Sequence, residues 1–288
     1  MENPLRSLLF VPGDQPGKIE KAWSAGSDCI VLDLEDGVAP SRKTMARQAI
    51  RETLHAAPTK HPAVLVRVES DLPQRILDIE TAIHPGVFGI MLPKCSTRSG
   101  IVDVAREVEQ AERRSGVAHG STRLFLLIES ARGLLELPSL VAGLDRVTAI
   151  VFGAEDWCLD MGIARTAGGD ELEIARWNVV VCARAHRLLA IDTAYADFHD
   201  PEGLRRDTEN ARRMGFTGKL AIHPKQVATI HSAFAPTSVE IAEAAAVVAA
   251  FGEAELQGRG VVAVNGRMVD KPVAERFRQI LLRAEKTK

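Results

Sequence analysis

Eight short apolar runs, each followed by a stretch of helical periodicity, constrain the fold of this chain more than any other feature. The runs are continuous rather than alternating, which is typical of strands buried on both faces in a parallel sheet. The expected strands comprise residues 7–12, 29–34, 63–68, 87–93, 123–129, 147–153, 191–197 and 218–223. This repetition predicts an α/β fold, a (β/α)8 TIM barrel, and 288 residues suffice for one such barrel.

The intervening stretches carry apolar residues at helical spacing. Residues 41–56 form one expected helix, and residues 171–190 form the longest and most apolar one. Its near-helically spaced apolar residues are Ile174, Trp177, Val181 and Leu188. A doubly wound open sheet is the alternative, but that fold usually has a Gly-rich turn after its first strand. The sequence contains neither G-x-G-x-x-G nor a P-loop, which favours the barrel.

The chain continues beyond the eighth strand–helix unit. We expect residues 1–235 to form the barrel domain and residues 236–288 to form a helix–hairpin–helix extension. An Ala-rich helix is expected from Ser238 to Phe251, and Asn265-Gly266 between two apolar runs predicts a type I′ hairpin. From the pattern alone, this extension would cap the barrel or hold a neighbouring subunit.

Composition narrows the class of protein. The formal net charge is −2 with acids and bases interspersed, so we expect no nucleic-acid or membrane partner. The first residues do not resemble a signal peptide, and no apolar stretch was expected to reach the roughly 18 residues of a membrane span. The cysteines show no metal-binding or redox spacing, which predicts reduced thiols in a cytoplasmic protein. They are Cys29, Cys95, Cys158 and Cys182.

Polar residues follow several of the apolar runs, and the ends of all barrel strands converge on one rim. Glu129 and Asp156 end successive strands, five and six. Mg²⁺ prefers oxygen ligands and binds one or two carboxylates while keeping open positions, so this pair predicts a Mg²⁺ site, with Mn²⁺ as a replacement. Alternatively, either acid caps the following helix.

Arg67, Lys94 and His223 also follow apolar runs. An unpaired guanidinium would be costly there, so Arg67 must meet a carboxylate, from a ligand or from Glu35 or Asp36 in a structural salt bridge. Lys94 would allow Schiff-base chemistry as a competing mechanism. For His223, packing or backbone anchoring is expected rather than acid–base work.

Together, the motifs resemble the citrate lyase β-subunit/malyl-CoA lyase (HpcH/HpaI aldolase-like) family, above all its freestanding citramalyl-CoA and malyl-CoA lyases. The similar segments run in order over nearly the whole chain. They are Arg6–Gly13, Val31–Val38, Val66–Val68, Met91–Lys94, Ile128–Ser130, Phe152–Asp156, Met214–Lys219, Ile222–Pro224 and Gly266–Asp270.

The resemblance implies a Mg²⁺-dependent barrel enzyme that forms a homotrimer or a dimer of trimers. Glu129 and Asp156 would be the metal ligands, and Arg67 would bind the keto-acid carboxylate as a catalytic and substrate-binding residue. Asp270 would be the acid/base that acts in the adjacent subunit's site. Coenzyme A would meet the segment after the first strand, although Gly17 replaces a lysine of some relatives. The candidate contacts there are Phe10, Lys18 and Lys21.

Two backbone contacts complete the expected site. Ile222 and His223 would contact the thioester arm through their backbone, as the resemblance implies. Backbone N–H groups at Ala154 and Glu155 would hold the keto-acid carboxylate beside Arg67.

The implied reaction is retro-Claisen cleavage of a 3-hydroxyacyl thioester to an α-keto acid and an acetyl thioester. (S)-Citramalyl-CoA, giving acetyl-CoA and pyruvate, is the preferred substrate, and malyl-CoA, giving glyoxylate, is the alternative. A citryl-acyl-carrier-protein lyase subunit of citrate lyase is a second alternative. A thioester hydrolase or a non-catalytic partner on the same barrel is a third.

Overall fold

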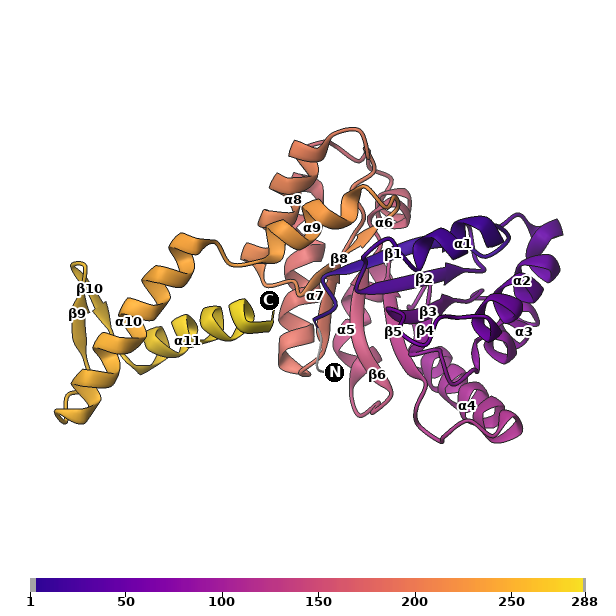
Figure 1. Cartoon of the computed structure of the whole chain (residues 1–288). Coiled ribbons are helices and arrows are strands. Elements are labelled where there is room, and N and C mark those ends of the chain that lie inside the picture. The colour runs from indigo at the N-terminus through magenta and orange to yellow at the C-terminus, as the bar shows by residue number, and fades with distance from the viewer. Residues whose placement is uncertain (1–3, 287–288) are drawn as a thin grey trace. The chain divides into compact units, whose positions relative to one another are not determined.

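The computed structural model describes residues 4–286 and divides them into two compact units. Leu5–His231 form the first, and the second contains the chain from Ser232 onward. Figure 1 labels the elements of both units.

The first unit is a closed barrel of eight parallel strands in sequence order, which confirms the predicted TIM barrel. The strands are β1 (Ser7–Pro12), β2 (Cys29–Asp33), β3 (Ala63–Arg67), β4 (Gly89–Leu92), β5 (Arg123–Ile128), β6 (Val147–Phe152), β7 (Leu189–Asp192) and β8 (Gly218–Ala221). In the register of the first three strands, Pro12 lies beside Asp33 and Asp33 beside Arg67. This pairing brings their terminal residues to one level.

Helices connect the strands and lie outside them (Figure 1). They are α1 (Pro16–Ala22), α2 (Lys43–His55), α3 (Gln74–Ala82), α4 (Arg98–Ser115), α5 (Ala131–Val141), α6 (Ala154–Met161), α7 (Glu173–Ala185) and α8 (Pro201–Met214). Two short 3₁₀ turns, η1 (Pro40–Arg42) and η2 (Asp170–Leu172), precede α2 and α7, and α9 (Gln226–Phe234) follows β8. The barrel interior is packed with side chains from the strands, including Leu65, Met91, Phe125 and Leu220.

Two expectations about the chain between β6 and β8 were wrong. The helix predicted over 171–190 ends at Ala185, and β7 begins at Leu189 rather than at 191. The apolar residues at helical spacing also lie on the outer face of α7, because Ile174 is 66%, Trp177 48% and Val181 62% exposed. The helix instead buries smaller side chains such as Ala175 and Val179. The helical spacing correctly placed these apolar residues on one face of α7, but spacing does not specify whether that face is buried or exposed.

A buried ionic network joins the β7–β8 side of the barrel to its helices. Asp192 accepts a two-pronged contact from Arg176, at 2.9 and 2.6 Å, and a third hydrogen bond from Lys219 at 2.6 Å. Asp207 on α8 bonds to the same two cations. Burial would raise the pKa of Asp207, but the charges of Lys219 and Arg176 outweigh it and lower that pKa to about 2. Every charge in the network therefore has a partner.

The second unit holds the predicted extension. It contains α10 (Ser238–Leu256), a two-stranded hairpin of β9 (Val262–Val264) and β10 (Arg267–Val269), and α11 (Lys271–Lys286). Asn265 and Gly266 have φ values of 51° and 73°, as a type I′ turn requires, which confirms the hairpin. A small core around Val247 and Phe251 packs these elements together.

One expectation about apolar stretches was wrong as stated. The segment Gln226–Leu256 is long and apolar enough to span a membrane, judged by length and composition alone. In the structure this segment is two helices, α9 and α10, with Pro236 between them and a capping box at the start of α10 formed by Thr237 and Glu240. Because apolar helices of other kinds pass the same test, one such match is weak support for a membrane span.

The four cysteines are buried free thiols, as expected from their spacing.

Removing one carboxylate from the buried network should destabilise the barrel. Asp192→Asn leaves Arg176 and Lys219 short of a counter-charge, which should lower the free energy of unfolding by about 3 kcal/mol. The matched change Asp103→Asn breaks an exposed pair with Arg106 and should cost no more than about 0.5 kcal/mol. Urea unfolding curves measure both values, and equal effects would show that the network is not a major source of stability.

Candidate active site

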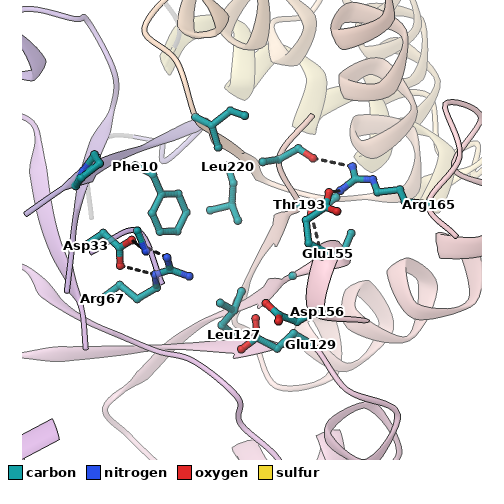
Figure 2. Close-up of a pocket in the computed structure, with 16 residues that line it drawn as sticks. Phe10, Asp33, Arg67, Leu127, Glu129, Glu155, Asp156, Arg165, Thr193 and Leu220 are labelled. Atoms are coloured by element: carbon teal, nitrogen blue, oxygen red, sulfur yellow. Dashed lines mark hydrogen bonds and ion pairs between the residues drawn. The ribbon is translucent and has the colours of Figure 1, made fainter. Parts of the chain in front are cut away.

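A cavity of about 330 Å³ lies at the carboxyl ends of the strands. Its walls come from the ends of β1, β2, β3, β5 and β8, from the start of α6 and from the loops that follow the strands. Figure 2 shows Arg67 and Asp33 on one side, Arg165 and Glu155 on the other, and Glu129 and Asp156 together between them. The rim predicted from the strand ends is thus one site.

Asp33 organises the first wall. Its Oδ1 accepts hydrogen bonds from the Glu35 N–H at 2.9 Å and from Arg67 Nε at 2.7 Å. Its Oδ2 accepts from the Gly37 N–H at 3.0 Å and from Arg67 Nη2 at 2.7 Å. Sequence reasoning assigned Asp33 no role in the site. Four hydrogen bonds now identify it as the anchor of the loop after β2.

Arg67 forms the protein salt bridge that was one of its two expected roles. Its partners are Asp33 and Glu35, with Nη1 lying 2.9 Å from Glu35 Oε2, and its guanidinium lies 4.8 Å from the ring centre of Phe10. Burial alone would lower the pKa of Arg67, but the hydrogen bond and charge of Asp33 and the charge of Glu35 raise it. The Nε–Nη2 edge is occupied by Asp33. A ligand carboxylate would therefore meet the Nη1–Nη2 edge, where it would share Nη1 with Glu35.

Lys94 connects this wall to the acidic pair. Its backbone, at φ 54°, donates a hydrogen bond from N–H to Glu129 Oε1 at 2.5 Å. Its ammonium donates to Glu35 Oε1 at 2.7 Å. Burial would lower the pKa of Lys94, but the hydrogen bond and charge of Glu35 raise it. The amine is thus held protonated, which disfavours the Schiff-base mechanism.

Glu129 and Asp156 form the acidic pair. Glu129 is only 3% exposed, and burial, followed by the charges of Asp156 and Glu35, raises its pKa to about 8. Asp156 lies in the first turn of α6 and faces the same cavity. Gly153 precedes that helix, and a Cβ there would lie 2.8 Å from Glu129 Oε2. A side chain at position 153 would therefore force Glu129 to shift.

The charges that line the cavity suit a divalent cation. Four carboxylates line it, those of Asp33, Glu129, Glu155 and Asp156, and two guanidinium groups. This leaves two negative charges in excess when all are ionised. Among residues 4–286, no group of three or more His, Cys, Asp or Glu side chains is arranged to hold a metal. Two carboxylates with open positions are nevertheless a donor set that Mg²⁺ accepts, whereas zinc sites typically include histidine or cysteine ligands.

The start of α6 is tied to the loop after β7. The Ala154 N–H donates to the Thr193 hydroxyl at 3.1 Å, so it is not available to a ligand as the sequence had suggested. The N–H groups of Glu155 and Asp156 are in the first helical turn, where no intrahelical acceptor exists. Arg165 pairs with Glu155 and donates to the Ala194 carbonyl at 2.7 Å.

Sequence reasoning missed Thr193 and Arg165. Thr193 follows the end of β7, which was predicted five residues too late, at 197 instead of Asp192, so correct placement would have exposed the signal. Arg165 lies in an irregular loop after α6 with no strand-end or periodic signal. Only the folded chain brings it to the cavity.

The segment after β8 supplies Ile222 but not the His223 side chain to the cavity lining. The N–H groups of both residues donate to Gln226 Oε1, at 2.8 and 3.2 Å. The His223 ring stacks on Phe198 with ring centres 5.0 Å apart, in line with the packing role expected for it.

The other expected residues are more scattered. Phe10 lines the cavity, whereas Lys18 and Lys21 lie on α1, exposed and outside the lining. Asp270 belongs to the second unit, where its Oδ1 accepts the Val273 N–H at 3.1 Å at the start of α11. This contact gives Asp270 a structural role as a helix cap.

Comparison with known proteins places this site in a family. The model for HpcH/HpaI aldolase/citrate lyase matches residues 6–224. The chain belongs to this family. It is therefore an enzyme of the citrate lyase type, a family of oxo-acid lyases.

The similarity to individual proteins extends over nearly the whole chain. Citrate lyase subunit beta of Leuconostoc mesenteroides subsp. cremoris is 35% identical over 96% of this chain and 92% of that protein. The (3S)-malyl-CoA thioesterase of Cereibacter sphaeroides is 34% identical, covering 98% and 95%. Protein CitE from Mycobacterium tuberculosis, solved with magnesium, acetoacetate and coenzyme A, has a TM-score of 0.83 at 29% identity, covering 99% and 100%.

The close approach at Gly153 gives a test of the acidic pair. Gly153→Ala should displace Glu129 and weaken Mn²⁺ or Mg²⁺ binding by roughly tenfold or more. Electron paramagnetic resonance of Mn²⁺ measures the affinity directly. Gly17→Ala is the control, because a Cβ there meets no atom within 4 Å. If Gly153→Ala binds the metal with unchanged affinity, the result would contradict a role of Glu129 as a metal ligand.

Proposed function

We propose that this protein is a Mg²⁺-dependent lyase that cleaves a 3-hydroxyacyl-CoA, with (S)-citramalyl-CoA as substrate and acetyl-CoA and pyruvate as products. The observation that carries the proposal is the pairing of Glu129 and Asp156 across one cavity from Arg67 (Figure 2). The solved Mycobacterium tuberculosis relatives support it, since one holds magnesium, acetoacetate and coenzyme A and another holds magnesium and pyruvate.

The proposed roles follow from the contacts. Arg67 would hold the carboxylate of the keto-acid half with its Nη1–Nη2 edge, while Asp33 fixes the guanidinium from the other edge. The N–H groups of Glu155 and Asp156 would hold the same carboxylate from the opposite wall. Glu129 and Asp156 would hold the Mg²⁺ ion, which lowers the pKa of the substrate hydroxyl when bound.

Cleavage breaks the bond between the hydroxyl-bearing carbon and the carbon next to the thioester carbonyl. The hydroxyl proton passes to water, and the oxygen's electron pair forms the keto group. The electrons of the broken bond form the thioester enolate, and the carboxyl group of Asp270 delivers a proton to its terminal carbon. The products are then the keto acid and the acetyl thioester.

Charge favours citramalyl-CoA or malyl-CoA over a citryl thioester. Both guanidinium groups of the cavity already have carboxylate partners, Arg67 with Asp33 and Glu35, and Arg165 with Glu155. The extra carboxylate of a citryl group would enter a site that already has an excess of negative charge, where an unpaired charge is costly. Malyl-CoA differs from citramalyl-CoA by one methyl group, a difference worth only about 1–3 kcal/mol.

Thioester hydrolysis is the second candidate, because the Cereibacter sphaeroides thioesterase is as similar to this chain as the citrate lyase subunits are. The two reactions differ in their products. A lyase releases an α-keto acid and acetyl-CoA, whereas a hydrolase releases the free hydroxy acid and coenzyme A.

We further propose that the enzyme is a cytoplasmic homo-oligomer, a trimer or a dimer of trimers. Monomeric proteins rarely expose contiguous apolar patches. Here Ile174, Trp177 and Val181 form an outward stripe on α7, and the extension exposes Leu256 and Met268. Asp270 would act in a neighbouring subunit's site, in addition to capping α11. The buried free thiols suit a reducing compartment.

One coupled assay tests the reaction and its metal. With Mg²⁺, the enzyme should convert citramalyl-CoA to acetyl-CoA and pyruvate faster than it cleaves malyl-CoA or citryl-CoA. EDTA, Glu129→Gln and Asp156→Asn should each reduce turnover by roughly a hundredfold or more, because the negative charge that develops on the substrate's hydroxyl oxygen is no longer stabilised. Lactate dehydrogenase with NADH detects pyruvate, and chromatography detects any free hydroxy acid.

The exposed variant Asp103→Asn is the control for that assay and should match the wild type. If the hydroxy acid and free coenzyme A are the sole products, the protein is a thioesterase and the proposed lyase reaction is wrong. Full activity in EDTA would contradict the metal site.

Subunit mixing tests Asp270. Asp270→Asn should bind Mg²⁺ and keto acid normally but lose roughly a hundredfold or more in cleavage, since a general acid–base group is removed. It should also lose exchange of the acetyl-CoA methyl protons, followed by NMR in D₂O. Mixed oligomers with Glu129→Gln should regain activity, because some sites then carry neither change. Verified mixed oligomers without activity would contradict a shared site.

A further inference from the structure

The loop after β8 is held by one buried side chain, that of Gln226, which is 2% exposed. Its Oε1 accepts the N–H groups of Ile222 and His223, and its own N–H donates to the His223 carbonyl at 3.0 Å. Three of the four backbone polar groups of Ile222 and His223 are therefore satisfied by Gln226. The group that Gln226 leaves available is the Ile222 carbonyl, an acceptor.

The same side chain ties this loop to the loop after β7. Gln226 Nε2 donates to the Tyr195 carbonyl at 2.8 Å, and the stack of Phe198 on His223 adds a second link. Tyr195 directly follows Thr193 and Ala194 at the start of the β7–α8 loop. Thr193 accepts the hydrogen bond from Ala154, and Ala194 accepts the one from Arg165. The wall of the cavity from α6 to Ile222 is thus one hydrogen-bonded unit that ends at Gln226.

We propose that Gln226 is a positioning residue that sets the donor and acceptor pattern of the thioester wall. By occupying both N–H groups, it leaves Ile222 able to recognise only a hydrogen-bond donor. In a CoA thioester the first donor along the arm is the amide N–H nearest the sulfur. Ile222 lines the cavity in which the acyl group would lie, so its remaining carbonyl would be the backbone group there that accepts that amide N–H. This inference rests on the proposed function.

Two thioesters that differ in one N–H test the proposal. The 3-hydroxy acid is offered as its N-acetylcysteamine thioester, which has the amide, and as its thioester with 2-mercaptoethyl acetate, which has an ester oxygen instead. The wild type should prefer the amide by about tenfold in kcat/KM, chiefly through KM, because one neutral hydrogen bond is lost in the ester.

Variants of Gln226 should change the ratio of kcat/KM between the amide and ester thioesters, whatever their effect on overall activity. Gln226→Met cannot accept the two N–H groups, and Gln226→Asn is too short to reach them and Tyr195 together, so both should abolish the preference. Gln226→Glu keeps the acceptor for the N–H groups but places a carboxylate oxygen against the Tyr195 carbonyl, so it should reduce the preference as well. Tyr195→Phe is the control, because it removes the hydroxyl bond to Asp200 but keeps the carbonyl that Gln226 binds.

Each variant is compared with itself on two substrates, so a general loss of stability cancels from the ratio. An unchanged preference in Gln226→Asn and Gln226→Met would overturn the role of Gln226, as would a wild type without preference. A wild type that cleaves neither these thioesters nor any 3-hydroxyacyl-CoA would instead overturn the proposed function. The two failures are therefore distinguishable.

Discussion

The ion pair between Asp33 and Arg67 is the interaction on which the rest of the site depends. Two charged groups are withdrawn from water at the ends of adjacent strands, which is tolerated only because all of their contacts are made in good geometry. Arg67 then holds Glu35, and Glu35 holds Lys94, whose backbone N–H fixes Glu129. One pair at β2 and β3 thereby positions a carboxylate at the end of β5.

The excess of negative charge gives this arrangement its chemical character. Glu129 is buried beside other acids, so its ionised form is costly until a cation joins it. The same excess would repel an anionic keto acid or hydroxyacyl group, despite Arg67 and Arg165. Cation and substrate are thus expected to bind favourably together. Such coupling explains why two guanidinium groups, each paired within the protein, belong in a site proposed for carboxylate substrates.

Much of the site could be predicted because barrel strands end on one rim. Arg67, Glu129 and Asp156 were found from their places after apolar runs, and the structure brings all three to one cavity. Arg165 was not found, because it lies in an irregular loop without a periodic or strand-end signal. Gln226 was not found either, since its importance lies in hydrogen bonds to backbone groups, and a sequence does not specify those partners.

The sequence by itself determined the order of strands and helices, the closed barrel, the hairpin at Asn265 and the family, because these follow from local periodicity, turn chemistry and ordered motifs. Only the tertiary structure decided which partner each charge takes and which way an apolar stripe faces. For Arg67, the structure shows the protein salt bridge, with Asp33 on one edge of its guanidinium, while its role toward a ligand carboxylate stays a proposal. Trp177 on α7 has the spacing of a buried face, yet it points outward. Helical spacing specifies which residues share a side, but the packing of neighbouring elements decides which side is buried.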